Sequence, residues 1–327
     1  MSDSTMGAQA VAIETRGLRR TFKSRSGAVE AVAGVDLQVR GGEIFGFLGP
    51  NGAGKTTTLR MLATLLQPSG GEATVAGADL LTQPALVRQC IGYVGQTGGS
   101  DTVETGRHEL IFQGRLHGMS RSQAQDRAAE LLAALEIESC ADRKTQTYSG
   151  GQRRRLDIAI GLMHRPQLVF LDEPTTGLDP QARAHLWEEV RKLRDTGTTI
   201  FLTTHYLEEA DALCDRLAII DQGRIVIEGT PDELKREVSG DVITLSLAGQ
   251  PDGALAQFAA LPFVREAQDD NGRIRLSVDR GETAMPLLMR ALDEAHLQMT
   301  TLTIARPSLD DVFLAKTGRS LREDSGT

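Results

Sequence analysis

A glycine-rich segment followed by a lysine and two threonines has the residue types that hold a polyphosphate. It fits the pattern G-x-x-x-x-G-K-[ST] and reads Gly49-Pro50-Asn51-Gly52-Ala53-Gly54-Lys55-Thr56-Thr57. Glycines allow the backbone to wrap round a phosphate with its N–H groups turned inward, and a helix that starts there adds partial positive charge. Lys55 would supply a full charge to the β and γ phosphates, and the Thr56 hydroxyl would ligate Mg²⁺.

Two adjacent carboxylates follow a short apolar run, Leu168–Leu171. Because side chains alternate along a strand, Asp172 and Glu173 should point in different directions. One carboxylate can hold Mg²⁺ through water while the other faces the water that attacks the phosphate. By itself such a pair is more often a helix cap or a solvated turn. With a phosphate-binding loop upstream, we favour Asp172 for the metal and Glu173 for the water.

A second anion site is indicated by the segment Tyr148-Ser149-Gly150-Gly151-Gln152. Ser149 can cap a helix, and the two glycines leave backbone N–H groups open to an anion. One nucleotide does not need two γ-phosphate sites in one chain, so this site would serve the nucleotide of a second copy. An ordinary capped helix is the alternative. The arginines that follow, Arg153–Arg155, spread over most of a helical turn, which favours a solvated or locally paired cluster over a dimer brace or a contact with a carboxylate.

Strands that alternate with helices must position these motifs. Apolar runs at 43–48, 91–94, 168–171 and 198–203 alternate with segments of helical character, which predicts a parallel sheet covered on both faces. Residues 106–135 carry leucines and alanines at near-helical spacing and indicate a helical insert.

A change of pattern near 239 predicts a domain boundary. Beyond it the order strand-helix-strand-strand-helix-strand fits a small ferredoxin-like α+β domain. The expected parts are a main domain at 1–238 with a helical subdomain at about 98–165, an accessory domain at 239–318 and a loose tail at 319–327.

Composition limits the kind of partner. The 327 residues suffice for a main domain with an appendage, and a formal net charge of −8 disfavours nucleic acid as a partner. The three cysteines, Cys90, Cys140 and Cys214, form no close pair, as expected of thiols in a reducing cytosol. The N-terminus lacks the features of a signal peptide, and no apolar run approaches the roughly 20 residues that span a bilayer. We therefore expect a partner to hold the chain wherever it acts at a membrane.

Taken together, the motifs resemble those of the ABC ATPase family over about residues 11–235. Gly49–Thr57 is similar to its Walker A loop, Leu168–Glu173 to its Walker B strand, and Tyr148–Gln152 to its signature motif, which usually opens with Leu. The other matches are Gln96 in the Q-loop, Asp179 in the D-loop, His205 as the switch histidine and Phe22 in place of the tyrosine that stacks on adenine. The implied fold is an α/β P-loop NTPase of ABC type: a parallel-sheet core, an antiparallel β subdomain and a helical insert, here with a small C-terminal α+β domain.

The resemblance also implies roles for single residues. ATP and Mg²⁺ would be the ligands, with Glu173, His205 and Gln96 as catalytic residues. Thr56, Gln96 and Asp172 would serve the metal.

The same resemblance implies a second copy as partner. Two chains would close head to tail round two ATP·Mg²⁺, with Ser149 and Gly151 of one chain completing the site of the other. Asp179 would communicate across that dimer.

Three further segments narrow the resemblance to the daunorubicin-resistance type of ATP-binding subunit. They are residues 61–66, MLATLL, residues 144–176, KTQTYSGGQRRRLDIAIGLMHRPQLVFLDEPTT, and residues 307–318, PSLDDVFLAKTG. In that type, a tyrosine at 148 is typical, and the ATPase works at the cytoplasmic face of the membrane. It drives a separate integral membrane permease that exports hydrophobic antibiotics such as anthracyclines. Thr97–Glu104 departs from the expected pattern where the chain would face the permease.

Other functions remain open at this point. One is an exporter ATPase for a lipid, a polysaccharide or another substrate. Another is a soluble non-transport ABC protein that acts on ribosomes or DNA, although such proteins usually carry two cassettes or a long coiled coil, and this chain shows one cassette with a short insert.

Overall fold

The computed structural model describes residues 10–24, 27–97, 99, 103–238, 240–248, 254–270, 273–295, 297–305 and 307–318. The chain divides into two compact units, Met1–Glu228 and Gly229–Thr327. The division comes before helix α8 (Pro231–Val238), earlier than the boundary expected at 238/239, because α8 packs on α11 (Leu309–Thr317) in the second unit. The expected tail at 319–327 lies outside the described residues.

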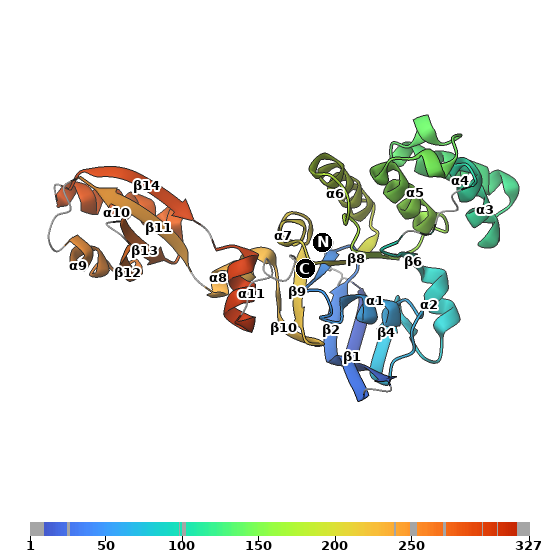
Figure 1. Cartoon of the computed structure of the whole chain (residues 1–327), viewed down its shortest axis with the longest axis horizontal. Helices are drawn as coiled ribbons and strands as arrows, with labels where there is room; N and C mark the ends of the chain where they lie inside the picture. Colours follow the sequence, from blue (N-terminus) through green and yellow to red (C-terminus); the bar gives the residue numbers. More distant parts are fainter. Residues whose placement is uncertain are drawn as a thin grey trace, which may run out of the picture. The chain divides into compact units, whose positions relative to one another are not determined.

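The first unit is built on a six-stranded sheet in the order β10-β9-β3-β8-β7-β6. Figure 1 labels its strands β10, β9, β8 and β6. Strands β9, β3, β8, β7 and β6 pair in parallel. The bounds are β3 Ile44–Leu48, β6 Ile91–Val94, β7 Leu168–Asp172, β8 Thr199–Thr204, β9 Arg216–Asp221 and β10 Arg224–Gly229. Every residue of β3, β7 and β8 is buried, as expected of parallel strands covered on both faces.

Four helices accompany this sheet. Their bounds are α1 Lys55–Leu62, α2 Pro84–Cys90, α6 Pro180–Asp195 and α7 Leu207–Leu213. Because parallel strands end at the same edge, the residues that follow β3, β6, β7 and β8 come together there. That edge is where the sequence places its phosphate loop, glutamine, carboxylates and histidine.

A second, four-stranded antiparallel sheet has the order β2-β1-β4-β5. Its bounds are β1 Val11–Ser24, β2 Gly27–Arg40, β4 Gly70–Val75 and β5 Ala78–Asp79. One hydrophobic cluster joins the two sheets, since it contains Leu18 and Val35 from this sheet together with Phe47 and Phe170 from the parallel one. The two sheets therefore share a core.

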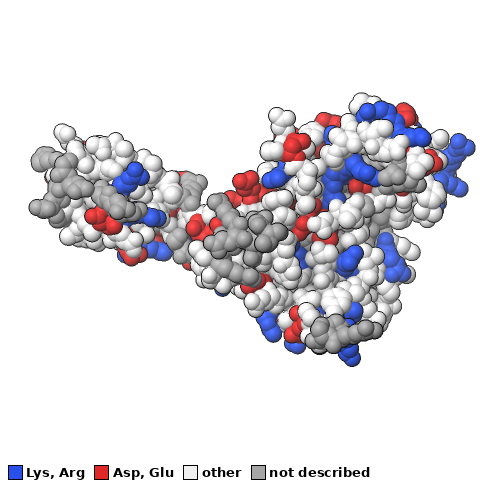
Figure 2. All heavy atoms as spheres, viewed as in Figure 1, with Lys and Arg blue, Asp and Glu red and all other residues white. Residues whose placement is uncertain are grey.

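Three helices form the insert between β6 and β7. They are α3 (Gly106–Leu116), α4 (Arg121–Ala134) and α5 (Gly150–Leu162), with short 3₁₀ turns η1 (Glu138–Cys140) and η2 (Thr145–Thr147) before α5. Ser120 and Ser149 cap α4 and α5 in capping boxes, which fixes where these helices begin. On the face shown in Figure 2, Lys and Arg gather over this insert, although the chain as a whole is acidic.

The second unit contains a four-stranded antiparallel sheet in the order β12-β13-β11-β14. Its elements are β11 Asp241–Leu247, α9 Ala254–Ala259, β12 Val264–Asp270, β13 Arg273–Val278, α10 Gly281–Glu294 and β14 Met299–Ala305. Alternate residues of β11 and β13, such as Ile243 and Leu276, pack with Phe258 and Leu288 of the helices. This order of elements is the strand-helix-strand-strand-helix-strand pattern read from the sequence.

Phe201 lies at the centre of the parallel sheet. Its ring is 5.7 Å from each of the rings of Phe45, Phe47 and Phe170, and its side chain is fully buried. Aromatic neighbours at this distance add to the stabilisation from apolar burial. The strands β3, β7 and β8 that deliver the site residues are therefore fixed to one another through this side chain.

We predict that Phe201→Ala lowers the free energy of unfolding of the first unit by about 3–5 kcal/mol, because it opens a cavity among three rings. Guanidinium unfolding followed by fluorescence checks this, since the single tryptophan, Trp187, lies in this unit. Phe112→Ala is the matched control, because Phe112 is 51% exposed and should change the value by less than about 0.5 kcal/mol. Equal losses for the two variants would contradict the central role of Phe201.

Candidate nucleotide-binding site

The phosphate-type loop leaves the carboxyl end of β3 and enters α1. Gly54 is its last residue before the helix and has φ +105°, in the left-handed region that favours glycine. A Cβ on Gly54 would lie 2.5 Å from the carbonyl oxygen of Ala31, and one on Gly49 would lie 2.3 Å from that of Ile220. Both glycines are therefore required by the close approach of other backbone of this chain, a reason that is separate from the predicted wrapping of the loop round a phosphate.

Lys55 lies inside this loop. Its side chain is 4% exposed, and Nζ donates hydrogen bonds to the carbonyl oxygens of Gly49 at 2.7 Å and Pro50 at 3.0 Å. The same nitrogen is 3.5 Å from Glu173 Oε1. Burial lowers the pKa of Lys55, and the negative charge of Glu173 opposes that shift. The ammonium group thus has its charge partner, the residue that follows β7, in place.

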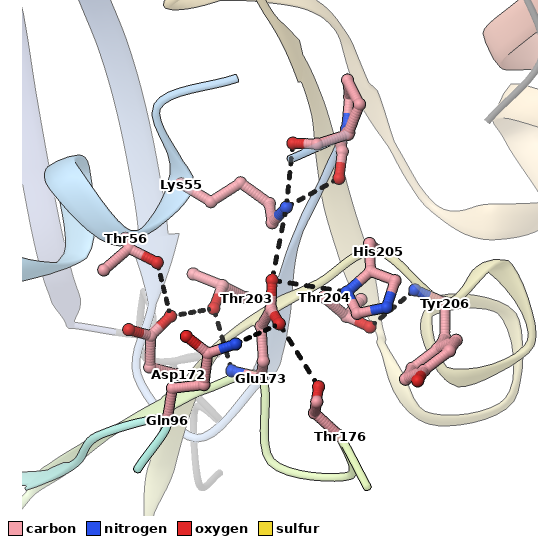
Figure 3. A network of polar contacts seen from close by, with 12 residues as sticks. Lys55, Thr56, Gln96, Asp172, Glu173, Thr176, Thr203, Thr204, His205 and Tyr206 are labelled. Atoms are coloured by element: carbon pink, nitrogen blue, oxygen red, sulfur yellow. Dashed lines mark hydrogen bonds and ion pairs between the residues drawn. The ribbon is translucent and has the colours of Figure 1, made fainter. Parts of the chain in front are cut away.

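Asp172 ends β7 and is held by two hydroxyl groups. Thr203 Oγ1 donates to Asp172 Oδ1 at 2.6 Å, and Thr56 Oγ1 donates to the same oxygen at 3.0 Å (Figure 3). The carboxylate is 1% exposed. Three elements, α1, β7 and β8, therefore meet at one carboxylate oxygen.

Glu173 is the hub of the polar network in Figure 3. Its backbone has φ +45°, an uncommon conformation for a residue with a Cβ, and its N–H donates to Thr203 Oγ1 at 3.1 Å. Its Oε2 accepts from Gln96 Nε2 at 2.9 Å and from Thr176 Oγ1 at 3.2 Å. His205 Nδ1 makes an ion-pair contact with Oε1 at 3.3 Å.

The protonation of Glu173 follows from these contacts. Burial acts to raise the pKa of its carboxyl, but His205 and Lys55 lower it by more, so the pKa lies below the ordinary value for glutamate. Glu173 is therefore ionised near neutral pH. Gln96, predicted to serve both catalysis and the metal, contacts Glu173 here.

An open pocket of about 480 Å³ adjoins the network. It is lined by Ala31, Asn51, Gly52, Gly54, Lys55, Thr56, Thr57, Gln96 and Glu173. The lining contains the loop backbone, the ammonium of Lys55, the amide of Gln96 and the carboxylate of Glu173. The volume of the pocket lies in the range of small-ligand sites. A nucleoside triphosphate with its phosphates on the loop fits this arrangement of donors.

Other predicted residues lie outside this network. Phe22 is in β1, is 39% exposed, and has the Arg20 guanidinium 4.7 Å from its ring centre. Tyr148 packs in the helical insert, where its hydroxyl donates to the carbonyl oxygen of Cys140 at 2.7 Å. Burial raises the pKa of Tyr148. Asp179 caps α6 by accepting from the N–H of Ala182 at 2.8 Å.

The signature segment begins α5 as predicted. Ser149 Oγ accepts from the N–H of Gln152 at 3.2 Å, and the Gln152 side chain accepts in return from the N–H of Ser149. A Cβ on Gly150 would lie 3.7 Å from Leu178, and one on Gly151 would lie 3.4 Å from Ala182. Within one chain, this segment thus lies against the turn that leads into α6.

Two charged residues near the site are buried although the sequence did not predict it. Arg154 was expected in a solvated or locally paired cluster, and that expectation is wrong: its side chain is buried and donates to backbone carbonyls of Gly95, Asp172 and Pro174. Three adjacent arginines carry no signal that tells a buried one from its neighbours.

Glu209 in α7 is the second such residue and is fully buried. Its Oε1 accepts from Trp187 Nε1 at 3.2 Å. Burial raises the pKa of Glu209, and the hydroxyl groups of Thr204 and Thr175 partly oppose that shift. The carboxyl of Glu209 therefore links the end of β8, at Thr204, to α6. Its spacing of four residues from Leu213, which places both side chains on the buried face of α7, was the available signal.

Comparison with known proteins decides the family. The family model described as ABC transporter matches residues 32–176, and the model of the DrrA1-3-like ATP-binding protein C-terminal domain matches 229–317. The daunorubicin/doxorubicin resistance ATP-binding protein DrrA of Streptomyces peucetius is 45% identical over 310 residues, 94% of this chain and 92% of that protein. The chain belongs to the ABC transporter family of ATP-binding proteins. It is an ABC-type ATPase, as predicted.

Two further matches describe the range of this family. The Nod factor export ATP-binding protein I of Rhizobium sp. (strain N33) is 38% identical over 96% of this chain and 99% of that protein. The dimeric post-hydrolysis structure of an ATP-binding cassette bound to ADP and Pi matches with a TM-score of 0.62 and 26% identity, and it covers 67% of this chain and 98% of that one. These matches confirm the predicted ABC fold class and nucleotide as the ligand.

The family implies Mg²⁺, and the donor set fits it. Thr56 Oγ1 and Asp172 Oδ1 are hard oxygen donors 3.0 Å apart at the loop, and Mg²⁺ binds through few protein oxygens together with water and substrate phosphates. Gln96 contacts Glu173 in this structure. Among the described residues, no helix is both long and apolar enough to cross a membrane.

We predict that Glu209→Gln changes how stability depends on pH. Because the pKa of Glu209 is raised in the folded chain, the unfolded chain loses this proton at a lower pH, close to the ordinary value of 4.5. The wild type therefore becomes less stable as the pH rises above that value. Glutamine has no such proton. The stability of the variant relative to wild type should therefore increase with pH, by up to about 1.4 kcal/mol per unit.

Urea unfolding at a series of pH values from 4 to 8, followed by the fluorescence of Trp187, measures that difference. Glu208→Gln is the matched control, because Glu208 is the exposed neighbour on the same helix. A difference between Glu209→Gln and wild type that stays constant over the range would contradict a raised pKa.

Proposed function

We propose that this ATPase drives the export of a hydrophobic compound, such as an anthracycline-type antibiotic, through a separate integral membrane permease. The observation that carries the proposal is its 45% identity over nearly the whole length of a daunorubicin/doxorubicin resistance protein. The match of 229–317 to the C-terminal domain of such proteins supports it, because that part is distinct from the ATPase core. The chain would then work at the cytoplasmic face of the membrane, held there by the permease.

The loop residues bind the substrate ATP. The backbone N–H groups of 49–54 and the start of α1 would surround the phosphates, and Phe22 would stack on adenine. Lys55 would exchange its bonds to Gly49 and Pro50 for the β and γ phosphates. Mg²⁺, when held by Thr56 and Asp172, would neutralise charge on the phosphate oxygens and align them.

Glu173 acts on the attacking water. It is ionised, and Gln96, His205 and Thr176 fix its carboxylate in one orientation. Because its pKa is low, it is a weak base, so we expect it to orient the water and accept the proton late. A loose phosphoryl-transfer transition state requires little proton removal before the P–O bond breaks. His205 would contact the γ-phosphate side of the nucleotide.

Completion of the site requires a second copy of the chain. Ser149 and Gly151 lie in a capped helix start with N–H groups that suit a γ-phosphate, and in their own chain no hydrogen bond or ion pair of the described residues joins them to Lys55 or Glu173. A head-to-tail dimer would bring Tyr148–Gln152 of each chain to the other's ATP, with Asp179 next to it. The related cassette was seen as a dimer.

A second candidate differs only in the exported substrate. The relative named for Nod factor export covers 96% of this chain at 38% identity, so one architecture serves exporters with different substrates. A lipid or polysaccharide therefore remains the alternative to a drug. Nucleic acid is not the expected partner, because the net charge of −8 disfavours binding to a phosphate backbone.

We predict that Glu173→Gln abolishes turnover and preserves ATP binding. Glutamine keeps the size of the side chain and removes its charge, so water is no longer activated while Lys55 and the loop remain. Turnover should fall by about 100-fold or more. Phosphate release and fluorescent-ATP binding measure the two effects, and a dimer that persists with ATP on gel filtration is expected. Full turnover in this variant would remove Glu173 from its role.

We also predict that drug resistance requires both this chain and its permease. A sensitive host that carries both genes should tolerate more daunorubicin than a host with either gene alone. Lys55→Met in the same pair is the control, because it removes the phosphate contact and should abolish the gain. A pair that hydrolyses ATP in membranes without conferring resistance would indicate another substrate. Co-purification of ribosomes in place of a membrane protein would contradict export altogether.

A further inference from the structure

One buried arginine contacts the backbone of both loops that carry catalytic side chains. Arg154 lies in the second turn of α5 and is 7% exposed. It donates hydrogen bonds to three backbone carbonyls, those of Gly95 at 2.6 Å, Asp172 at 3.0 Å and Pro174 at 2.8 Å. Each bond uses a different nitrogen, so the whole guanidinium is engaged. The planar fork of arginine suits three fixed acceptors, whereas a lysine ammonium has no such preset geometry.

Two of these carbonyls flank Glu173. Its own backbone is in the left-handed region at φ +45°, a strained conformation that persists only where surrounding contacts hold it. Arg154 holds the peptide groups of the preceding and following residues, and Thr203 holds the N–H of Glu173 itself. The direction of the Glu173 carboxylate therefore depends on Arg154.

The third carbonyl belongs to the residue before Gln96. One turn further along α5, the buried carboxylate of Asp157 accepts from the N–H of Gly99 at 3.1 Å. The same helix thus holds the segment that carries Gln96 near both of its ends, with a positive group at Gly95 and a negative one at Gly99. Gln96 lies between them and reaches Glu173.

A role in packing alone does not account for a charged side chain at this place. Taking a guanidinium out of water is costly unless its donors are satisfied, and an apolar residue would fill the space at lower cost. Burial lowers the pKa of Arg154, while Asp157 and Asp172 oppose that shift. Arginine nevertheless remains charged in proteins, and its charge strengthens the bonds to the carbonyls.

We propose that Arg154 is a positioning residue for ATP hydrolysis. It holds Glu173 and Gln96 in their working geometry from α5, the helix that begins with the signature segment. This inference rests on the proposed roles of Glu173 and Gln96. Arg154 does not touch the substrate. Its loss should therefore lower the rate of hydrolysis and leave nucleotide binding, which depends on the loop at 49–57, nearly unchanged.

The test compares full-length variants reconstituted with the permease, by ATP turnover and by binding of a fluorescent ATP analogue. Arg154→Met should lower kcat by about 10- to 100-fold, as expected when reacting groups are misplaced by about an ångström, with analogue affinity within about threefold. Arg154→Lys keeps the charge without the fork and should lie between Arg154→Met and wild type. Arg153→Met is the matched control, because Arg153 is the partly exposed neighbour on the same helix, and it should stay within about twofold of wild type.

A double-mutant cycle separates positioning from a general structural effect. If Arg154 acts through Glu173, then Arg154→Met should lower the small residual rate of Glu173→Gln much less than it lowers the wild-type rate. An equal factor in both backgrounds would overturn the proposal. So would a kcat for Arg154→Met within twofold of wild type.

A second variant keeps the proposal testable if Arg154→Met does not fold. Asp157→Asn is nearly isosteric and weakens the hold on the Gln96 segment at its other end, so it should also lower kcat without lowering analogue affinity. Folded Arg154→Lys and Asp157→Asn proteins that both have wild-type kcat would overturn the inference. The proposed function fails separately, if the wild-type chain with its permease does not hydrolyse ATP or if Glu173→Gln retains full turnover.

Discussion

A buried pair of opposite charges sets the requirements for the rest of the site. Lys55 and Glu173 are 4% and 8% exposed and lie 3.5 Å apart, and burial of either charge alone would be strongly unfavourable. Each therefore needs further partners. Lys55 finds them in the loop carbonyls of Gly49 and Pro50. Glu173 finds them in Gln96, Thr176 and His205, which requires that β6, β7 and β8 end at the same edge of the sheet.

The sequence was sufficient for most of this arrangement. The phosphate loop, the two carboxylates at the end of β7 and the capped start of α5 were recognisable, because each depends on a short contiguous pattern whose physical reason is local. The order of strands and helices predicted the parallel sheet, and the change of pattern near 239 indicated the second unit. A long helical stretch at 106–135 proved to be two helices, since Gly118 and the Ser120 cap divide it.

Side chains whose partners are distant in sequence could not be predicted in the same way. Arg154, Thr203 and Glu209 act on residues that lie 18 or more positions away along the chain or on other elements. The residue types of Arg154 and Glu209 are ordinary for exposed positions, and only the folded chain shows that these two are buried. Thr203 was expected in a covered strand, but its bond to Asp172 was not. The domain division at Glu228 also depended on a tertiary contact, that of α8 with α11.

The helix α5 has a consequence for energetics. In the proposed mechanism, its first residues offer N–H groups to a partner's γ-phosphate, and its second turn holds the groups that act on the chain's own γ-phosphate. In the proposed dimer, two such helices would connect the two sites in opposite directions. Thermodynamic linkage is reciprocal. If ATP at one site changes the ATP affinity of the other site by some factor, then ATP at the other site changes the affinity of the first by the same factor. Because the two chains of the proposed dimer are identical, neither site can be a dedicated regulator of the other.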